Sequence, residues 1–346
     1  MKTFKDGIIG YGWVAGAHIE AINQCAAAEV VAVYSARELS PESLAAAHGG
    51  AIRAYSDLDA MLADDSIDVI SICSYPARHK DQAVAVARAG KHLIIEKPLA
   101  LSMADCREIE RAADEAGVQV CVCFECRYSS QFLTTKAVID QGLLGEIHYG
   151  EVDYYHGIGP WYGQYRWNTT RENGGSSLLS AGCHAMDALL LCMGAEVESV
   201  TSSATGSKNA DFSSYEYPTT CVTIVNFTDG RVGKVASVID CLQPYYFHTH
   251  LVGSEGSLLD KRFHSTRLGG LDKSAWSELS MKLLDSGDVS DHPYQTQFEA
   301  YFEALRRGEA MALTSLDEAM KSFEVIFAAD LSAAEKRKVE LSEIRG

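Results

Sequence analysis

The feature that most constrains the fold is a regular alternation of short apolar segments with helical segments in the first third of the chain. The apolar segments have the length and β-branched content of buried strands, and they cover residues 7–9, 30–34, 69–72, 93–95 and 118–124. Helical patterns separate them, at residues 14–26, 40–47, 58–64, 79–89 and 102–116. Repeated strand–helix–strand units form a doubly wound parallel sheet with helices on both faces, which we predict for residues 1–123. Ligands of such sheets bind beyond the carboxyl ends of the strands.

Beyond residue 123 the pattern changes to longer strand-like runs. Helical patterns at residues 130–141 and 180–193 precede runs at residues 197–203, 219–228, 231–240 and 248–253. Asp229-Gly230, between two of these runs, is a tight hairpin signal. We therefore predict a second, α+β domain over residues 124–346, with an antiparallel sheet and C-terminal helices that pack back on the body.

A glycine-rich turn, Gly10-Tyr11-Gly12-Trp13-Val14-Ala15, joins the first predicted strand to the first helix. Glycine at the first two positions permits a tight turn and close approach of a ligand, and alanine at the third is a tolerated variation. Gly10, Gly12, Trp13 and Val14 would then surround a pyrophosphate at the helix N-terminus. The string also fits an ordinary strand-to-helix turn, but its place in the first strand–helix unit favours a dinucleotide.

The end of the second strand bears on the choice between NAD and NADP. Val33-Tyr34-Ser35-Ala36-Arg37 carries no acidic residue to bind a ribose hydroxyl, whereas Ser35 and Arg37 suit a 2′-phosphate. The alternative is that Arg37 is a solvated loop residue. We expect NAD or NADP, and this run favours NADP.

A charged pair, Glu96-Lys97, follows the strand-like run 93–95 at the edge where a parallel sheet binds ligands. A lysine beside a nicotinamide can bind a substrate hydroxyl and stabilise negative charge on its oxygen. The alternative is an ordinary surface ion pair.

Charge and cysteine content exclude several classes of partner. With 47 acidic and 30 basic residues the formal net charge is −17, which disfavours nucleic acids and anionic membranes. The polar start of the chain lacks the pattern of a secretory signal, so we expect a cytoplasmic protein with its ten cysteines reduced. Cys121, Cys123 and Cys126 are interpreted as packing residues, and no metal site is predicted.

Five motifs together resemble the Gfo/Idh/MocA family of NAD(P)-dependent oxidoreductases, the relatives of glucose-fructose oxidoreductase and inositol dehydrogenase. They are the loop 10–18, the run 73–79 (Cys-Ser-Tyr-Pro-Ala-Arg-His), Glu96-Lys97-Pro98, the segment 174–187 and the run 253–258. The resemblance implies a Rossmann domain, an open-faced and mainly antiparallel sheet domain that forms a homodimer or homotetramer, and hydride transfer between NAD(P) and a sugar or cyclic polyol.

The resemblance also implies roles for individual residues. It makes Lys97 and His184 the catalytic pair, with His184 as general base and Glu96 beside the cofactor. The family usually has an aspartate four residues before the histidine, where this chain has Ser180, on the same face of the predicted helix. A serine offers only neutral hydrogen bonds, so the imidazolium loses its carboxylate support.

Further candidates are less strongly tied to the motifs. Ser74 and His79 match family positions that line the dinucleotide, with a helix cap as the alternative. Substrate contacts are assigned to Glu125, where the family has an amide, and to Ser180 and His184. They are also assigned to His156, Arg166 and Trp167. These residues lie in and just after a Gly-rich aromatic loop that starts at Tyr154-Tyr155. The alternative is that the aromatic residues of this loop form a core or oligomer contact. His248 and His250 would share one strand face, but a metal would need a third ligand.

Three functions remain open at this point. The leading one is a reversible sugar or polyol dehydrogenase. The second is redox-neutral, NAD-dependent glycoside cleavage through a transient 3-keto intermediate. The third is a non-catalytic sensor of dinucleotide or sugar, against which the retention of Lys97 and His184 argues.

Overall fold

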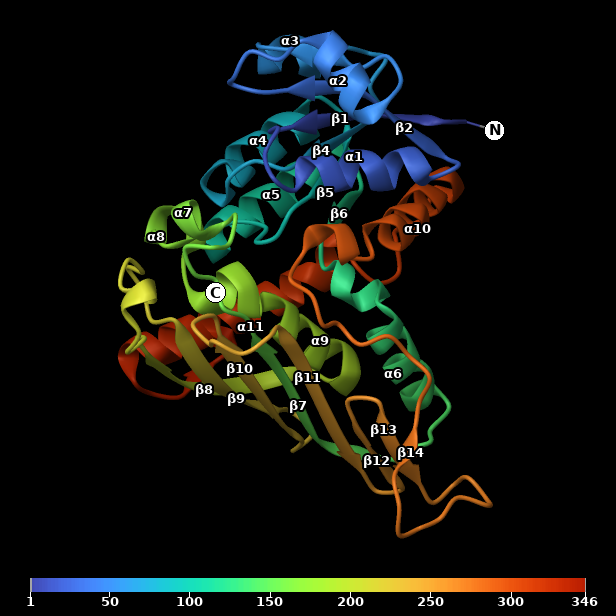
Figure 1. Cartoon of the computed structure of the whole chain (residues 1–346), viewed down its shortest axis with the longest axis vertical. Helices are drawn as coiled ribbons and strands as arrows, with labels where there is room; N and C mark the ends of the chain where they lie inside the picture. Colours follow the sequence, from blue (N-terminus) through green and yellow to red (C-terminus); the bar gives the residue numbers. More distant parts are fainter. Residues whose placement is uncertain (1, 346) are drawn as a thin grey trace. The chain divides into compact units, whose positions relative to one another are not determined.

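The computed structural model describes residues 2–345, which form two compact units. The first comprises the chain up to Glu125 together with His292–Met320. The second comprises Cys126–Asp291 together with the chain from Lys321 onward. Each unit contains one of the two large sheets of the fold (Figure 1).

The first unit is built on a six-stranded parallel sheet. Its strands are β1 (Phe4–Ile9), β2 (Ala28–Tyr34), β3 (Arg53–Tyr55), β4 (Val69–Ile72), β5 (His92–Ile95) and β6 (Val120–Val122). The order β3-β2-β1-β4-β5-β6 reverses between β1 and β4, which confirms the predicted doubly wound sheet and opens its ligand crevice there. The sequence did not predict β3, because its residues Arg-Ala-Tyr form no apolar run.

Helices flank these strands, and three of them have a side-chain N-cap. They are α1 (Ala15–Gln24), α2 (Pro41–His48), α3 (Leu58–Leu62), α4 (Pro76–Arg88), α5 (Met103–Ala116) and, from the end of the chain, α10 (Tyr294–Arg307). Ser40, Asp57 and Ser102 accept backbone N–H groups at the starts of α2, α3 and α5. The late helix α10 packs against α1, so a segment distant in sequence completes this unit.

The second unit is built on a nine-stranded, mainly antiparallel sheet in the order β14-β13-β12-β11-β7-β10-β9-β8-β15. Its strands are β7 (Ile147–Tyr155), β8 (Val197–Thr205), β9 (Thr220–Phe227), β10 (Val232–Val238), β11 (Tyr246–Gly253), β12 (Gly256–Leu259), β13 (Arg262–Ser265), β14 (Ser277–Glu278) and β15 (Val339–Glu340). The hairpin predicted at Asp229-Gly230 is confirmed: β9 and β10 pair antiparallel, and Gly230 has φ +87°. This sheet therefore confirms the α+β class.

Strand β7 lies between β11 and β10 in this sheet, and the sequence analysis did not predict it. It pairs antiparallel with β11 but parallel with β10. The predicted start of the aromatic loop at Tyr154-Tyr155 is wrong, since both residues are in β7, and the loop follows from His156. Aromatic and charged residues occupy alternate positions of β7, and this mixture hid the strand pattern.

The second unit contains six α-helices among the described residues, and one of them, Cys183–Met193, is almost completely buried. They are α6 (Ser130–Asp140), α7 (Tyr165–Asn168), α8 (Arg171–Gly174), α9 (Cys183–Met193), α11 (Leu316–Glu335, which begins in the first unit) and α12 (Ser342–Arg345). Helix α9 packs on β7 and β10 (Figure 1). The stretch Arg171–Met193 is long and apolar enough to span a membrane, but 83% of its most apolar window is buried inside the fold, as in the core helix of a soluble protein.

A buried ion pair holds α9 in this unit. The Arg127 guanidinium donates from Nε and from one terminal nitrogen to the two Asp187 carboxylate oxygens, each at 2.7 Å. The Ser322 hydroxyl donates to the same carboxylate at 2.7 Å. Both charged side chains are at most 3% exposed, so each depends on the other for compensation of its charge.

We expect Arg127→Ala to lower the free energy of unfolding by about 3–5 kcal/mol, because it leaves the Asp187 carboxylate buried without its countercharge. Urea-induced unfolding followed by circular dichroism measures this loss. The double variant Arg127→Met/Asp187→Leu removes both charges and should lose less stability than the single variant. An equal or greater loss in the double variant would contradict this account.

Candidate active site

The glycine turn between β1 and α1 brings two strand ends close together. Gly10 has φ +90°, and a Cβ there would lie 3.0 Å from the carbonyl carbon and oxygen of Cys73, directly after β4. A Cβ at Gly12, in contrast, would have no atom of the described chain within 4 Å. Gly10 is thus required by the fold itself, whereas the space beside Gly12 is open to a ligand.

The N-terminus of α1 is suited to an anion. Its N-cap residue, Val14, makes no side-chain capping hydrogen bond, and the first turn contains no acidic residue. The helix has ten residues, so its first-turn N–H groups and dipole favour a phosphate at this end. Together with the open space at Gly12, this end of α1 fits the pyrophosphate of a dinucleotide.

Ser35 and Arg37, at the end of β2, lie beside the same turn. The Ser35 Oγ accepts the Arg37 backbone N–H at 3.1 Å, and the exposed Arg37 guanidinium donates to the Tyr11 carbonyl. The structure therefore brings together the turn and both residues that the sequence associates with the cofactor phosphate.

His79 links two loops of the first unit through its ring nitrogens. Nδ1 lies 2.8 Å from the Pro98 carbonyl oxygen and Nε2 lies 3.1 Å from that of Ser74. Burial lowers the pKa of His79 although both carbonyls oppose the shift, so the ring is neutral and donates to only one of them at a time. The alternative of a helix cap is wrong, because α4 starts after Tyr75 and the Ser74 hydroxyl donates to Gln82.

The Glu96 carboxylate is buried instead of forming a surface pair with Lys97. Its Oε1 accepts hydrogen bonds from His18 Nε2 at 2.9 Å and from the Tyr294 hydroxyl at 2.7 Å. Its Oε2 accepts the Lys97 backbone N–H at 3.1 Å. Burial alone would raise the pKa of Glu96, but the hydrogen bond and charge of His18 outweigh it and lower the pKa. Lys97 itself is half-buried at the end of β5.

Two side chains at this carboxylate were not assigned a role from the sequence. His18 stands at the end of the glycine-turn motif, so the motif contained a signal for it. Tyr294 comes from α10, and no local pattern connects it with Glu96, which lies 198 residues earlier. Glu125 has a similar distant neighbour, because His292 Nδ1 lies 3.0 Å from its buried carboxylate.

In the second unit, His184 lies in the first turn of α9 and is 3% exposed. The regular helix expected from residue 180 is interrupted: Leu178–Gly182 forms a π-helical turn that contains Ser180. A Cβ on Gly182 would lie 2.4 Å from the Ser237 Cβ, so the glycine lets this turn approach β10. Such turns are frequent at functional sites.

Ser180 belongs to a buried chain of neutral polar groups. Its Oγ lies 3.5 Å from the Tyr217 hydroxyl, which donates to the Asn168 carbonyl at 2.5 Å. Burial raises the pKa of Tyr217, so this phenol stays protonated. Ser180, which stands where the family usually has an aspartate, thus contacts the hydroxyl group of Tyr217.

Three residues in and after the aromatic loop, His156, Arg166 and Trp167, are assigned to the substrate, and their surroundings differ. His156 is buried, with its Nδ1 2.9 Å from the Tyr154 hydroxyl and its ring against those of Tyr162 and Tyr245. Arg166 is exposed and Trp167 is half-buried, both on the short helix α7.

The segment before His184 is anchored by a second carboxylate. The Ser176 hydroxyl donates to Asp330 Oδ2, on α11, at 2.7 Å. Withdrawal from water raises the pKa of Asp330 to about 6, although the hydrogen bond from Ser176 and the charge of Arg171 act in the opposite direction.

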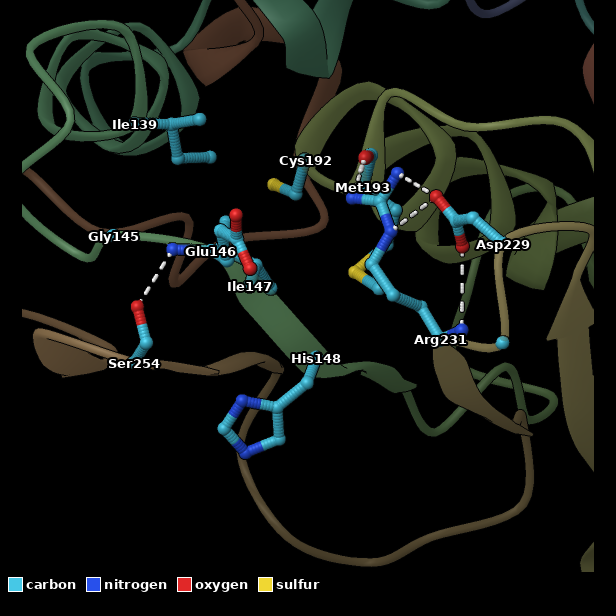
Figure 2. A pocket seen from close by; sticks show the side chains of 11 residues that line it. Ile139, Gly145, Glu146, Ile147, His148, Cys192, Met193, Asp229, Arg231 and Ser254 are labelled. Carbon is cyan, nitrogen blue, oxygen red and sulfur yellow. Dashed lines mark hydrogen bonds and ion pairs between the residues drawn. The ribbon is translucent and has the colours of Figure 1, made fainter.

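A pocket of about 610 Å³ in the second unit does not contain these residues (Figure 2). Several of its polar groups already have partners: the Arg231 Nε donates to Asp229 at 2.8 Å, and the Ser254 Oγ accepts the Glu146 N–H at 3.0 Å. We therefore do not assign the candidate site to this pocket.

Comparison with known proteins supports the same fold and identifies a family of oxidoreductases. Residues 4–124 match the model of an oxidoreductase family with an NAD-binding Rossmann fold (GFO_IDH_MocA), and residues 132–259 match that family's C-terminal domain. The chain is 24% identical to myo-inositol 2-dehydrogenase of Thermotoga maritima over 98% of its own length and 99% of the relative. It is 25% identical to D-apiose dehydrogenase of Paraburkholderia graminis over 99% and 91% of the two chains. An oxidoreductase structure from Agrobacterium radiobacter, with NAD+, L-tartaric acid and magnesium, shares the fold at a TM-score of 0.84, with 20% identity over 99% of both chains.

We expect Asp330→Asn to stabilise the protein more at about pH 8 than at about pH 5. The folded carboxyl, with its pKa near 6, retains its proton at pH values where the unfolded carboxyl has lost it, so the wild type loses stability as pH rises through that window. Urea unfolding of both proteins at the two pH values measures the difference. Asp317→Asn, an exposed change on the same helix, is the control for the loss of a carboxylate from α11.

Proposed function

Because this chain belongs to the Gfo/Idh/MocA family of oxidoreductases, we propose that it is an NAD(P)-dependent dehydrogenase of a sugar, a glycoside or a cyclic polyol. The observation that carries the proposal is the glycine turn: the open space at Gly12 and the uncapped start of α1 lie at the switch point of the parallel sheet. The full-length relatives named as inositol and apiose dehydrogenases support the substrate class.

The residues Gly10, Gly12, Trp13 and Val14 would hold the pyrophosphate, with Ser74 and His79 beside them. The bound nicotinamide supplies a hydride acceptor and donor. Lys97 then binds the oxygen of the reacting hydroxyl and stabilises its negative charge, and His184 removes its proton. Glu96 fixes the backbone of Lys97 through the 3.1 Å hydrogen bond to its N–H.

Ser180 changes the environment of the proposed base. Its neighbour Tyr217 is a neutral donor, so the network offers hydrogen bonds without a negative charge. We propose that Ser180 binds a substrate hydroxyl, as do Glu125, Arg166, Trp167 and His156. The proposed base then lacks the aspartate that the family usually has at position 180.

We further propose a homodimer or homotetramer formed through the outward face of the nine-stranded sheet. Val222 and Ile224 on β9 and Val232 on β10 are each 37–39% exposed, which is apolar surface for a partner. The ten free cysteines fit a cytoplasmic protein.

We expect Lys97→Met and His184→Gln each to lower kcat by about 10²-fold or more, because each removes a group that acts on the reacting hydroxyl. The test is turnover of inositols, glycosides and 3-keto sugars, followed at the absorbance band of the reduced nicotinamide. Lys80→Met and His148→Gln, at surface positions, are the controls and should retain activity. No turnover of any of these compounds would contradict the proposal, and glycoside cleavage without net cofactor reduction would replace it with the redox-neutral reaction.

Arg37→Ala should lower kcat/KM for NADP by about tenfold and leave that for NAD nearly unchanged, because the guanidinium pairs only with the additional phosphate. Steady-state kinetics with both cofactors measures this change. A matched change at Glu38, Glu38→Ala, is the control. Equal losses with NAD and NADP would contradict the assignment of Arg37 to the 2′-phosphate.

A further inference from the structure

The outward face of β7 and β11 brings together a carboxylate and two imidazoles. Glu151 is directly opposite His250 in the antiparallel register, and His248 is opposite Asp153, the next outward residue of β7. One potential ligand atom from each of Glu151, His248 and His250 lies within 4.8 Å of the others, and all three side chains are half-buried. Strand β7 thus places a third potential ligand beside the two histidines, which the sequence alone did not indicate.

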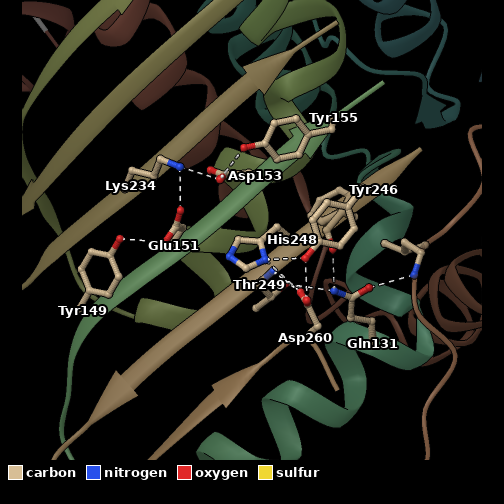
Figure 3. Close-up of polar contacts among 12 residues, drawn as sticks. Gln131, Tyr149, Glu151, Asp153, Tyr155, Lys234, Tyr246, His248, Thr249 and Asp260 are labelled. Carbon is tan, nitrogen blue, oxygen red and sulfur yellow. Dashed lines mark hydrogen bonds and ion pairs between the residues drawn. The ribbon is translucent and has the colours of Figure 1, made fainter. Parts of the chain in front are cut away.

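A second carboxylate orients one of the imidazoles. His248 Nδ1 lies 3.2 Å from Asp260 Oδ1, and the Tyr246 hydroxyl donates to Asp260 Oδ2 at 2.7 Å (Figure 3). A histidine that donates its Nδ1–H to a carboxylate presents Nε2 as the basic atom, which is the usual arrangement behind metal-bound histidines. The arrangement at His248 therefore matches that of a ligand with its supporting residue.

The charge balance of this cluster favours a divalent cation. Three carboxylates, on Glu151, Asp153 and Asp260, and one ammonium, on Lys234, give it a formal charge of −2 when both imidazoles are neutral. The Lys234 Nζ contacts Glu151 at 2.7 Å and Asp153 at 2.6 Å. Lys234 can therefore keep its contact with Asp153 when Glu151 turns towards a cation.

We propose that Glu151, His248 and His250 bind a divalent transition-metal ion of the zinc type, with Asp260 as the residue that orients His248. Two histidines and one carboxylate are a common ligand set for zinc, at about 2.0–2.2 Å from the metal. The site joins two neighbouring strands of the second unit and does not depend on the proposed dehydrogenase activity.

The test uses the full chain, without an affinity tag, after removal of metal with a chelator and dialysis. Zinc chloride is titrated by calorimetry, and the metal retained after a second dialysis is measured by mass spectrometry. We expect one zinc ion per chain. Glu151→Gln and His250→Gln should each weaken zinc binding by at least about tenfold, and Asp260→Asn by about 10–100-fold.

Two further variants distinguish the loss of a zinc ligand from misfolding of the protein. One should leave zinc binding unchanged, and the other should strengthen it. His148→Gln changes an exposed histidine on β7, three residues before Glu151 and on the opposite face, and should bind zinc as the wild type does. Lys234→Met removes the competing ammonium and should tighten zinc binding, a result that an unfolded variant would not give. Thermal melts without metal confirm that each variant is folded.

Two results would overturn the proposal. One is a wild-type protein that retains no zinc after dialysis. The other is a folded Glu151→Gln/His250→Gln double variant that binds zinc as tightly as the wild type. Cobalt(II) provides an independent readout, since its intense visible bands in a four-coordinate site should appear in the wild type and in His148→Gln and be lost in the double variant.

Discussion

One buried carboxylate, that of Glu96, ties together the parts of the first unit on which its ligand crevice depends. It receives hydrogen bonds from His18 on α1, from Tyr294 on α10 and from the backbone of Lys97 at the end of β5. A buried carboxylate without such donors would be strongly disfavoured, so the three elements are held in one arrangement. The helix behind the glycine turn and the strand end that carries Lys97 are consequently fixed by the same side chain.

The second unit fixes its histidine in a different way. Helix α9 is held by the Arg127–Asp187 pair, and the π-helical turn before it is packed on β10 through the missing side chain of Gly182. The hydrogen bond from Ser176 to Asp330 restrains the same segment a few residues earlier. His184 is thus placed by interactions that lie on both sides of it in sequence, and Ser180 lies where the helix is widest.

The sequence could predict those features whose signals are local. The β1–turn–α1 unit is encoded by Gly10 and Gly12, and the β9–β10 hairpin by Asp229-Gly230. The π-helical turn could not be predicted, since it depends on how closely Gly182 approaches Ser237, 55 positions later in the chain. Nor could the contact of Tyr294 with Glu96, because no residue near either one identifies the other. Strand β7 escaped prediction because its outward positions carry Tyr149, Glu151, Asp153 and Tyr155, a mixture that does not alternate cleanly in hydrophobicity.

Those same outward residues show why β7 has polar side chains on a strand with partners on both sides. Its inward positions are used for packing: a Cβ on Gly150 would lie 2.6 Å from the Met193 sulfur of α9, so the helix sits almost directly on the backbone. Its outward positions carry charged side chains, and Lys234 pairs with Asp153 there while Asp260 contacts His248 on β11. A strand so closely packed on one face cannot shift without disturbing α9. An ion bound by residues of both β7 and β11 on the other face would therefore also restrain β7, the strand on which α9 and its His184 pack.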